Sequence, residues 1–335
     1  MITASDVLKA GHTAVITGAS SGIGRAAALD FAAKGMNVWM LDIDAEDLEL
    51  AKQLVASKKV SEEQVGTQKG GKRWSTASNI KISCAFLCLP QKIEGRALDV
   101  QDLDGMVAVA EEVFASDGKV NILMNNAGIG LGGGALTSMD VVQKVVGVNT
   151  YGPIHGCLAF VPKMKESGEP GIIVNTGSKQ GITMPPGNLS YNMSKAALKC
   201  YTEGLEHELM KERAEGGKLK AALLVPGWVN TSILLKALAA EKGEEFDVTT
   251  CPFHEEKPAG GAWMPSQVVD FLIEELDKGR FYVICPDNDV DRETDNIRMT
   301  WTMQDITQDR PPLSRWHPDW GDKFKEHLAE VKSEK

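Results

Sequence analysis

The chain has 335 residues, and its 46 acidic residues outnumber its 36 basic ones, which gives a formal net charge of -10 at pH 7. The basic residues form no cluster that could neutralise a run of phosphates, and no apolar run approaches the ~20 residues of a membrane span. Residues 1–10 mix polar and apolar side chains, unlike a secretory leader. We therefore expect a cytoplasmic protein whose partners include neither nucleic acid nor membrane.

The cysteines are scattered along the chain, without the paired spacing of a zinc site or of a disulfide framework. We therefore expect reduced, mostly buried thiols and no metal centre. The six cysteines are Cys84, Cys88, Cys157, Cys200, Cys251 and Cys285.

A strand-helix rhythm opens the chain. Residues 13–17 are mostly apolar and lead into glycines, and residues 22–34 then carry apolar side chains at helical spacing until Gly35. A second strand is predicted for 37–42 and a second helix for 45–56. This rhythm predicts a parallel sheet with helices on both faces.

The rhythm breaks over residues 57–93, which are polar and basic at first, then apolar, and have no consistent period. One interpretation is a surface insertion, because long irregular loops are tolerated at the periphery of a sheet. Another is a retained intron spanning residues 66–91. The tract 83–91 can be encoded by pyrimidine-rich codons ending in CAG, as the 3′ end of an in-frame intron would be.

The alternation then resumes and predicts seven strands in all. The further strands are predicted at 95–98, 120–124, 171–176, 220–225 and 281–284, and the further helices at 103–114, 138–148, 152–165, 190–210 and 265–277. We expect an α/β fold with a single doubly wound (Rossmann) domain over residues 11–285 and a mostly parallel sheet.

Residues 286–335 form a charged, Trp-rich C-terminal extension. The proline and tryptophan residues of segment 310–320 predict an extended arm that docks on another surface. Three roles are possible for this arm: it could pack on its own domain, contact another subunit, or form a wall of the substrate pocket.

The turn after the first strand, Thr17 to Gly24, is rich in glycine. Glycines let a backbone approach a pyrophosphate lying over the N-terminus of the next helix. Asp42 ends the second strand, where a carboxylate binds the ribose hydroxyls and disfavours a 2′-phosphate, so we expect NAD in preference to NADP. The alternative role for Asp42 is a helix cap, for which Asp44 is better placed. Arg25 keeps NADP possible.

Tyr191 and Lys195 are four residues apart on a predicted helix and therefore share one face. A nearby ammonium group stabilises phenolate and lowers the phenol pKa, so Tyr191 could exchange a proton with an alcohol or a carbonyl. Ser178 follows the strand at 171–176, and its hydroxyl could polarise the substrate oxygen. Ser178 could also be a turn residue, and Asn149 a helix C-terminal residue.

These motifs, in this order, resemble the short-chain dehydrogenase/reductase family. Gly18, Gly22 and Gly24 match its T-G-x-x-x-G-x-G pattern, residues 125–128 match N-N-A-G, and Tyr191 with Lys195 matches Y-x-x-x-K. The resemblance implies four catalytic residues, Asn149, Ser178, Tyr191 and Lys195. It implies cofactor contacts from Thr17, Gly18, Ser20, Ser21, Gly22, Ile23, Gly24, Asp42, Asp99, Val100, Asn126, Ala127, Gly128, Tyr191, Lys195, Pro226, Gly227, Val229 and Thr231.

The resemblance also implies hydride transfer between a nicotinamide and a secondary alcohol or ketone. The pocket would come from 130–136, 184–189 and 231–262, whose composition indicates a partly apolar substrate. Asn126 could instead tie adjacent strands together, and we expect His155 to be a packed histidine. The alternative function is a dinucleotide sensor that keeps the fold without turnover.

Family members commonly pair the long helix at 190–210 across a two-fold axis, so we expect a homodimer or homotetramer. The apolar face assigned to that contact comprises Ala197, Leu198, Tyr201, Leu205 and Leu209.

Overall fold

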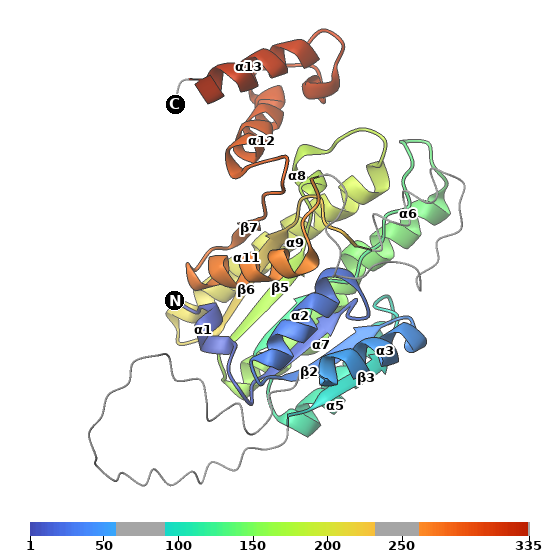
Figure 1. The fold of residues 1–335 in the computed structure, drawn as a ribbon, viewed down its shortest axis with the longest axis vertical. Helices are drawn as coiled ribbons and strands as arrows, with labels where there is room; N and C mark the ends of the chain where they lie inside the picture. The colour runs from blue at the N-terminus through green and yellow to red at the C-terminus, as the bar shows by residue number, and fades with distance from the viewer. Residues whose placement is uncertain (58–90, 232–260, 334–335) are drawn as a thin grey trace, which may run out of the picture.

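The computed structural model describes residues 1–57, 91–231 and 261–333, and within these ranges one sheet contains seven strands in the order β3-β2-β1-β4-β5-β6-β7 (Figure 1). Every pair of neighbouring strands is parallel, which confirms the doubly wound α/β prediction and extends it from mostly to fully parallel. The strands are β1 (Thr13–Thr17), β2 (Asn37–Asp42), β3 (Ile93–Ala97), β4 (Ile122–Asn125), β5 (Gly171–Thr176), β6 (Leu219–Val225) and β7 (Tyr282–Ile284).

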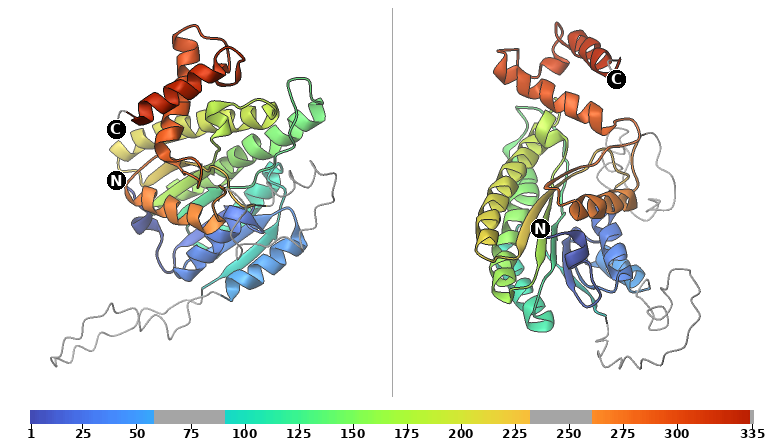
Figure 2. Two further views of the ribbon diagram at one scale, coloured as in Figure 1. Left: turned by 45° about the horizontal axis from the view of Figure 1, so that its top comes forward. Right: turned by 90° about the vertical axis from the view of Figure 1, so that its left-hand side faces the viewer.

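Helices cover both faces of this sheet because side chains alternate along each strand. In β1, Ala14 and Ile16 pack on one face and Val15 packs on the other. The first face is covered by α1 (Ala4–Val7), α2 (Gly22–Ala33), α3 (Ala45–Ala56) and α11 (Pro265–Asp277), and the second by α5 (Leu103–Asp117), α7 (Gly152–Ser167) and α9 (Leu189–Ala214). Figure 2 shows the two layers on either side of the sheet.

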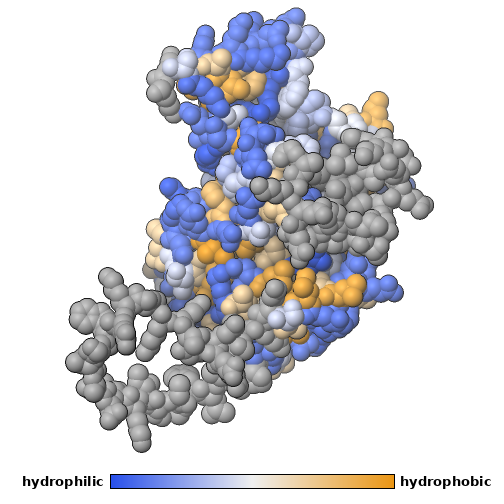
Figure 3. Space-filling model, in the orientation of Figure 1, coloured by the Kyte–Doolittle hydropathy of each residue, from blue (hydrophilic) through white to orange (hydrophobic). Residues whose placement is uncertain are grey.

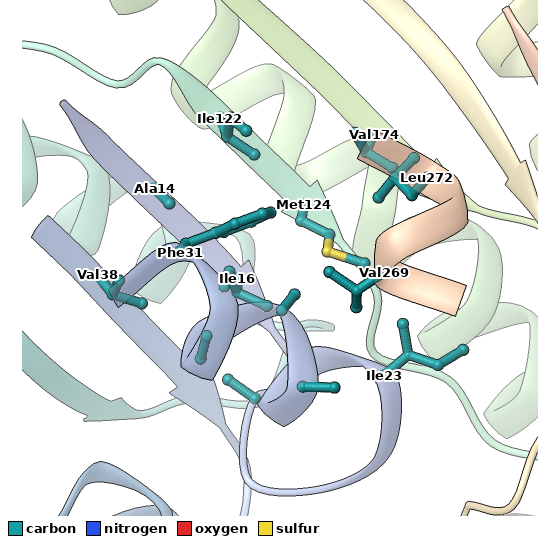
Figure 4. Packing of buried hydrophobic residues seen from close by; sticks show 14 of the residues in the cluster. Ala14, Ile16, Ile23, Phe31, Val38, Ile122, Met124, Val174, Val269 and Leu272 are labelled. Atoms are coloured by element: carbon teal, nitrogen blue, oxygen red, sulfur yellow. The ribbon is translucent and has the colours of Figure 1, made fainter. Parts of the chain in front are cut away.

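The core under α2 and α11 is a continuous apolar cluster (Figure 4). Phe31 of α2 lies against Ile16 and Met124 of the sheet, and Val269 of α11 completes the layer. Burying such side chains stabilises the fold by roughly 1.5–3 kcal/mol each. This packing fixes the sheet whose carboxyl edge carries the predicted site.

The helices predicted at 138–148 and 152–165 are one continuous helical segment in the structure. Helix α6 (Met139–Val146) passes through the π-helical turn η1 (Gly147–Tyr151) into α7. Asn149 therefore lies inside a π turn, and the alternative that it is a helix C-terminal residue is wrong. π turns of this kind are frequent at functional sites.

The prediction of an extended arm at 310–320 is wrong, because this segment forms turns and a short helix. The C-terminal extension around it is helical. It forms α12 (Arg292–Thr307), the short helix η3 (Ser314–Trp316) and α13 (Gly321–Ser333). The tryptophans build a small core of their own, in which Trp301 packs against Phe324 and donates a hydrogen bond to Ser314 Oγ at 2.7 Å. The Arg310 guanidinium stacks on Trp301 at 4.1 Å.

This helical unit projects beyond the sheet next to the short helix α8 (Gln180–Thr183) (Figure 1). Figure 3 shows mainly hydrophilic side chains on its visible face, around a small apolar patch. The helical unit thus extends the molecule beyond the carboxyl edge of the sheet.

The predicted insertion at 57–93 falls almost entirely on residues outside the described ranges, so neither interpretation of it is tested. Its C-terminal end is firmly held. The Gln91 side-chain amide donates hydrogen bonds to the carbonyl oxygens of Ala32 and Met36 at 2.8 and 2.7 Å. The next residue, Lys92, pairs with the buried carboxylate of Asp117 at 2.8 Å.

Candidate active site

Tyr191, Lys195 and Ser178 lie together at the carboxyl edge of the sheet. Lys195 Nζ lies 5.7 Å from the centroid of the Tyr191 ring and donates a hydrogen bond to the carbonyl oxygen of Thr176 at 2.8 Å. The Tyr191 phenol is hydrogen-bonded to the hydroxyl of Ser178. The loop after β5 and the first turn of α9 therefore bring a phenol, an ammonium and a hydroxyl into one group.

Close packing of α8 on α9 fixes this arrangement. A Cβ on Gly181 would lie 2.6 Å from the backbone carbonyl carbon of Lys195, so only glycine lets the two helices approach this closely. The Ser178 hydroxyl also accepts a hydrogen bond from the Gln180 N–H at 3.2 Å. The turn role considered for Ser178 and its contact with Tyr191 are thus compatible.

The electrostatics of the pair differ from the prediction. Burial raises the pKa of the Tyr191 phenol above its ordinary value of 10.0, and the hydrogen bond from Ser178 only partly opposes this rise. The prediction of a lowered phenol pKa is therefore wrong for the protein alone, because desolvation of phenolate outweighs the local donors. Burial also lowers the pKa of Lys195 to about 8.

Asn149 joins the loop after β4 to α9. Its side-chain amide donates to the Ile129 carbonyl oxygen at 2.9 Å and to Ser194 Oγ at 3.1 Å, and its Oδ1 accepts from the Ile129 N–H at 2.8 Å. A Cβ on Gly128 would lie 3.3 Å from Asn149 Oδ1 and 3.5 Å from Lys195 Nζ. Asn149 is therefore next to the Tyr191 group and fully buried.

The glycine turn packs directly against the loop after β4. Gly18 has a φ of +65°, and a Cβ there would lie 2.8 Å from the Cα of Ala127. The Asn126 side-chain amide donates to the carbonyl oxygens of Thr17 and Gly18 at 3.2 and 3.4 Å, and its Oδ1 accepts from Thr176 Oγ1 at 3.3 Å. The strand-tying role considered for Asn126 is confirmed.

The same turn suits a pyrophosphate. The first turn of α2 reads Gly22-Ile23-Gly24, so it carries no carboxylate that would repel an anion at the N-terminus of the helix. Thr231 approaches from the other side, because a Cβ on Gly22 would lie 3.1 Å from Thr231 Cγ2. The segment after β6 thus returns to the glycine turn, as the sequence predicted.

Asp42 joins the glycine turn to the residue that caps the following helix. Its Oδ2 accepts a hydrogen bond from the Ser20 N–H at 2.9 Å. The cap of α3 is Asp44, whose carboxylate accepts from the N–H groups of Glu46 and Asp47, both at 3.0 Å. The assignment of the cap to Asp44 is confirmed. Asp42 Oδ1 accepts a long hydrogen bond from the Asp44 N–H at 3.4 Å, so the Asp42 carboxylate lies between the glycine turn and the start of α3.

Asp99 and Val100 begin the connection from β3 to α5. The Asp99 carboxylate accepts a hydrogen bond from the Gln101 N–H at 2.9 Å. The Val100 carbonyl oxygen lies 3.0 Å from His155 Nδ1 on α7. His155 is thus half-buried and hydrogen-bonded to backbone, as expected of a packed histidine.

Two of the predicted pocket segments lie side by side. The Leu189 N–H donates to the Gly133 carbonyl oxygen at 3.0 Å, which joins residues 130–136 to 184–189. The exposed side chains of Leu131 and Met184 give this region apolar character. Met184 has a φ of +49°, a strained value for a residue other than glycine. Most of the third segment, 231–262, lies outside the described residues.

The helix face assigned to subunit pairing is partly occupied within the chain. Leu209 is buried in the core under α7 and α9, and Tyr201 and Leu205 pack against the same cluster. Leu198 is also fully buried. Only Ala197 of the five is exposed. The prediction of a free apolar face there is therefore wrong, because these side chains cover the chain's own sheet.

Two further predictions concern metal and membrane. Among residues 1–57, 91–231 and 261–333, no three His, Cys, Asp or Glu side chains are grouped to hold a metal ion. In the same ranges no helix has the length and apolar character to cross a bilayer. The three cysteines that the structure describes are free thiols: Cys157 and Cys285 are buried and Cys200 is exposed.

Thr176 and Lys179 flank this site and were not among the predicted residues. Thr176 contributes a backbone carbonyl, which no side-chain motif reveals. Lys179 pairs with two aspartates more than a hundred residues away in the chain, Asp287 and Asp295. Its only sequence signal is that it follows Ser178 directly.

The sequence of this chain is similar to those of known proteins. A family model for short chain dehydrogenase matches residues 12–69 and 75–242. The SadH protein of Mycobacterium tuberculosis is 30% identical over 236 residues, which cover 70% of this chain and 72% of SadH. Retinol dehydrogenase 10 of Xenopus tropicalis is 29% identical over 236 residues, which cover 70% of this chain and 66% of that protein.

A solved structure is similar over a larger share of the chain. The crystal structure of a short chain dehydrogenase/reductase from Burkholderia phymatum in complex with NAD has a TM-score of 0.69 and 26% sequence identity. The similarity covers 91% of this chain and 97% of that one.

Proposed function

Because the chain belongs to the short chain dehydrogenase family of oxidoreductases that bind nicotinamide cofactors, we propose that it transfers a hydride between a nicotinamide and the carbon of a secondary alcohol or ketone. The observation that carries this proposal is the grouping of Ser178, Tyr191 and Lys195 at the carboxyl edge of the sheet. The bound nicotinamide would accept or supply the hydride. The chain's own residues would bind and orient the substrate and move the proton.

Ser178 and Tyr191 act on the substrate oxygen. Their two hydroxyls already share a hydrogen bond, so one alcohol or carbonyl oxygen can bind to both in its place. The Ser178 hydroxyl donates to that oxygen and polarises a carbonyl. Tyr191 gives the proton in reduction and takes it in oxidation.

Lys195 and Asn149 support the proton transfer. The hydrogen bond to Thr176 holds the Lys195 ammonium beneath the Tyr191 ring, where its charge stabilises the phenolate form. Asn149 fixes the loop at Ile129 and, through Ser194, the turn of α9 that carries Lys195. Both residues therefore act on Tyr191 and not on the hydride.

The cofactor contacts are assigned to the residues around the glycine turn. The N–H groups at the start of α2 would hold the pyrophosphate, with Thr231 beside them. Asp42 would bind the ribose hydroxyls, which favours NAD over NADP. Structures similar to this chain were solved with NAD and with NADP, so the proposed preference rests on Asp42 alone.

Replacement of Tyr191 by Phe tests the proposal. A panel of alcohols, ketones and aldehydes, with primary alcohols included because a relative is a retinol dehydrogenase, is assayed with NAD and NADP by the absorbance of the reduced cofactor. We expect Tyr191→Phe to lower kcat by roughly 10²- to 10⁴-fold, the usual contribution of a general acid or base, with NADH binding retained. Tyr282→Phe is the matched control, because it removes an exposed phenol outside the proposed site. Tyr282 begins β7, and its hydroxyl donates a hydrogen bond to Glu203 of α9.

Two results would contradict the assignment. Near-normal turnover in Tyr191→Phe would remove Tyr191 from the mechanism. Wild-type protein that binds NADH but turns over no compound in the panel would favour the dinucleotide sensor instead.

The assembly and the cellular location are also proposals. We propose a cytoplasmic homodimer or homotetramer, with residues 11–285 as the domain and 286–335 as its extension. Light scattering after size exclusion measures the oligomeric state, and a monomer at micromolar concentration would contradict it. Fractionation of cells expressing the tagged full chain tests the location.

A further inference from the structure

A buried ion cluster joins the C-terminal extension to the loop that carries Ser178. Lys179, the next residue, places its Nζ 2.6 Å from Asp295 Oδ2 and 3.3 Å from Asp287 Oδ2. The two carboxylate side chains are only 2% and 5% exposed, for Asp287 and Asp295 respectively. Asp295 lies in the first turn of α12 and Asp287 in the segment between β7 and α12.

The cluster also touches the segment after β6. Asp287 Oδ2 accepts a hydrogen bond from the Trp228 N–H at 3.4 Å, and the Lys179 N–H points to the Pro226 carbonyl oxygen at 3.5 Å. A Cβ on Gly227 would lie 2.5 Å from Asp287 Oδ2 and 2.9 Å from Lys179 Nζ. Glycine at this position therefore lets the charged groups lie directly against the backbone.

Asp287 is held in place by the segment that carries it. Asp287 Oδ1 accepts hydrogen bonds from the N–H groups of Val290 and Asp289 at 2.8 and 3.2 Å. Burial raises the pKa of Asp295, and the Lys179 ammonium and the Arg298 guanidinium oppose that rise. The Asp287 carboxylate is thus fixed by backbone hydrogen bonds, and the Lys179 side chain lies between it and Asp295 of α12.

Such a cluster is an expensive way to stabilise a fold. Removing charges from water costs several kcal/mol per ion, and well-packed apolar side chains often stabilise as much or more. What an ion cluster supplies is a defined geometry, because the partners must meet within hydrogen-bond distance. Here the cluster links two loops, the one that carries Ser178 and the segment after β6.

We propose that Lys179, Asp287 and Asp295 form a positioning device through which the C-terminal extension sets the spacing between the Ser178 loop and the Pro226–Val229 segment. This inference rests on the proposed function, in which Ser178 holds the substrate oxygen, and on the cofactor contact that the family resemblance assigns to Val229. Lys179 touches neither substrate nor cofactor and acts through its neighbours. Loss of the cluster shifts Ser178 relative to the nicotinamide and slows hydride transfer.

The test uses Lys179→Met and Asp295→Asn in the full chain. We expect each to lower kcat by roughly 10- to 100-fold, the effect of a misplacement of about 1 Å, while the Kd for NADH changes by less than about threefold. Asp295→Asn keeps the shape of the side chain and the Lys179–Asp287 pair, so it serves if Lys179→Met folds poorly. The double variant should lose little more than Lys179→Met alone, because Lys179→Met already removes the Lys179–Asp295 pair that Asp295→Asn breaks.

Lys332→Met is the matched control. Lys332 pairs with Asp291 at 3.3 Å in the same helical unit, but both side chains are exposed and neither belongs to the cluster. It should leave kcat unchanged. Lys179→Arg, which keeps a cation, should recover part of the lost rate, whereas a loss caused only by poorer folding would appear as a lower Tm with normal kcat per folded molecule.

A second measurement separates this inference from the proposed function. Amide hydrogen exchange of the full chain should be faster at residues 176–184 and 226–231 in Lys179→Met and Asp295→Asn, and unchanged in Lys332→Met, whether or not a substrate is known. Unchanged exchange in both loops would overturn the positioning role. Faster exchange in the two cluster variants, together with no turnover of any compound by the wild-type protein, would support the positioning role and reject the proposed reaction.

Discussion

The Nζ atom of Lys195 lies 5.7 Å from the centre of the Tyr191 ring, and its hydrogen bond to the Thr176 carbonyl oxygen keeps it there. The i, i+4 spacing on α9 brings the two side chains to one helix face, but the end of β5 decides where the ammonium sits. The distance between the Lys195 ammonium and the Tyr191 ring is therefore set by two elements, α9 and the end of β5.

Lys195 should impose a pH dependence on the reaction. Burial lowers its pKa to about 8, so the ammonium is charged below that pH and loses its charge as the pH rises through it. Tyr191 does not titrate in this range, because burial raises its pKa above 10.0. We expect kcat for ketone reduction to be level below about pH 8 and to fall above it.

Lys195→Met is the check on that assignment. Its rate should be low at every pH and should lack the step near pH 8. A step that persists in Lys195→Met would assign the titration to another group.

Asp42 should decide the cofactor preference. Its carboxylate lies beside the glycine turn, bonded to the Ser20 N–H at 2.9 Å, where a 2′-phosphate would meet negative charge. We expect Asp42→Ala to shift the ratio of kcat/KM for NAD over NADP toward NADP by about tenfold or more.

Asp44→Ala is the matched control for Asp42. It removes the cap of α3 and should cost about 1 kcal/mol of stability without changing cofactor preference. An equal shift in preference from both variants would point to a disturbed helix rather than to a lost ribose contact.

Asn149 should be needed for both stability and rate. The fully buried side chain makes three hydrogen bonds, and Asn149→Ala leaves the Ile129 N–H and carbonyl without them. We expect a loss of about 2–3 kcal/mol in the free energy of unfolding, measured with urea, and a lower kcat at temperatures where the variant is folded. A normal kcat in the folded variant would reduce Asn149 to a structural residue.

Asp117 should make folding stability depend on pH. Burial on its own would raise its pKa, but hydrogen bonds from Lys92, Trp39, Ser116 and Thr13 outweigh burial and lower the pKa below 3.8. A lowered carboxyl pKa adds stability that is present above about pH 4 and is lost as the pH falls through the folded value.

Asp117→Asn provides the measurement. Its urea denaturation should show a deficit of about 1–3 kcal/mol against wild type between pH 5 and 7, shrinking toward acid pH. A deficit that is constant down to pH 3 would mean that the charge of Asp117 contributes nothing.

Local patterns were enough to predict most of the domain. Alternating apolar runs and helical spacings predicted the seven strands within about two residues of their observed ends, because each strand buries both faces or one face in the same core. The glycine turn and the Tyr191–Lys195 spacing were predictable for the same reason: backbone freedom and helical geometry depend on a few adjacent residues.

The C-terminal extension was not predictable in this way. The Pro and Trp residues of segment 310–320 predicted an extended arm, yet Trp320 packs edge-on against Trp301 of α12, nineteen residues earlier in the chain. The helix face assigned to subunit pairing failed similarly, because an apolar stripe does not say whether its partner is the same chain or another copy.

The sequence by itself determined the α/β fold, the family and the chemical groups at the carboxyl edge of the sheet. Only the tertiary structure decided how those groups are tuned and held: the raised phenol pKa of Tyr191, the position of Asn149 inside a π turn, and the ion cluster of Lys179 with Asp287 and Asp295. Burial and contacts between distant segments set these features, and neither is encoded in the spacing of adjacent residues.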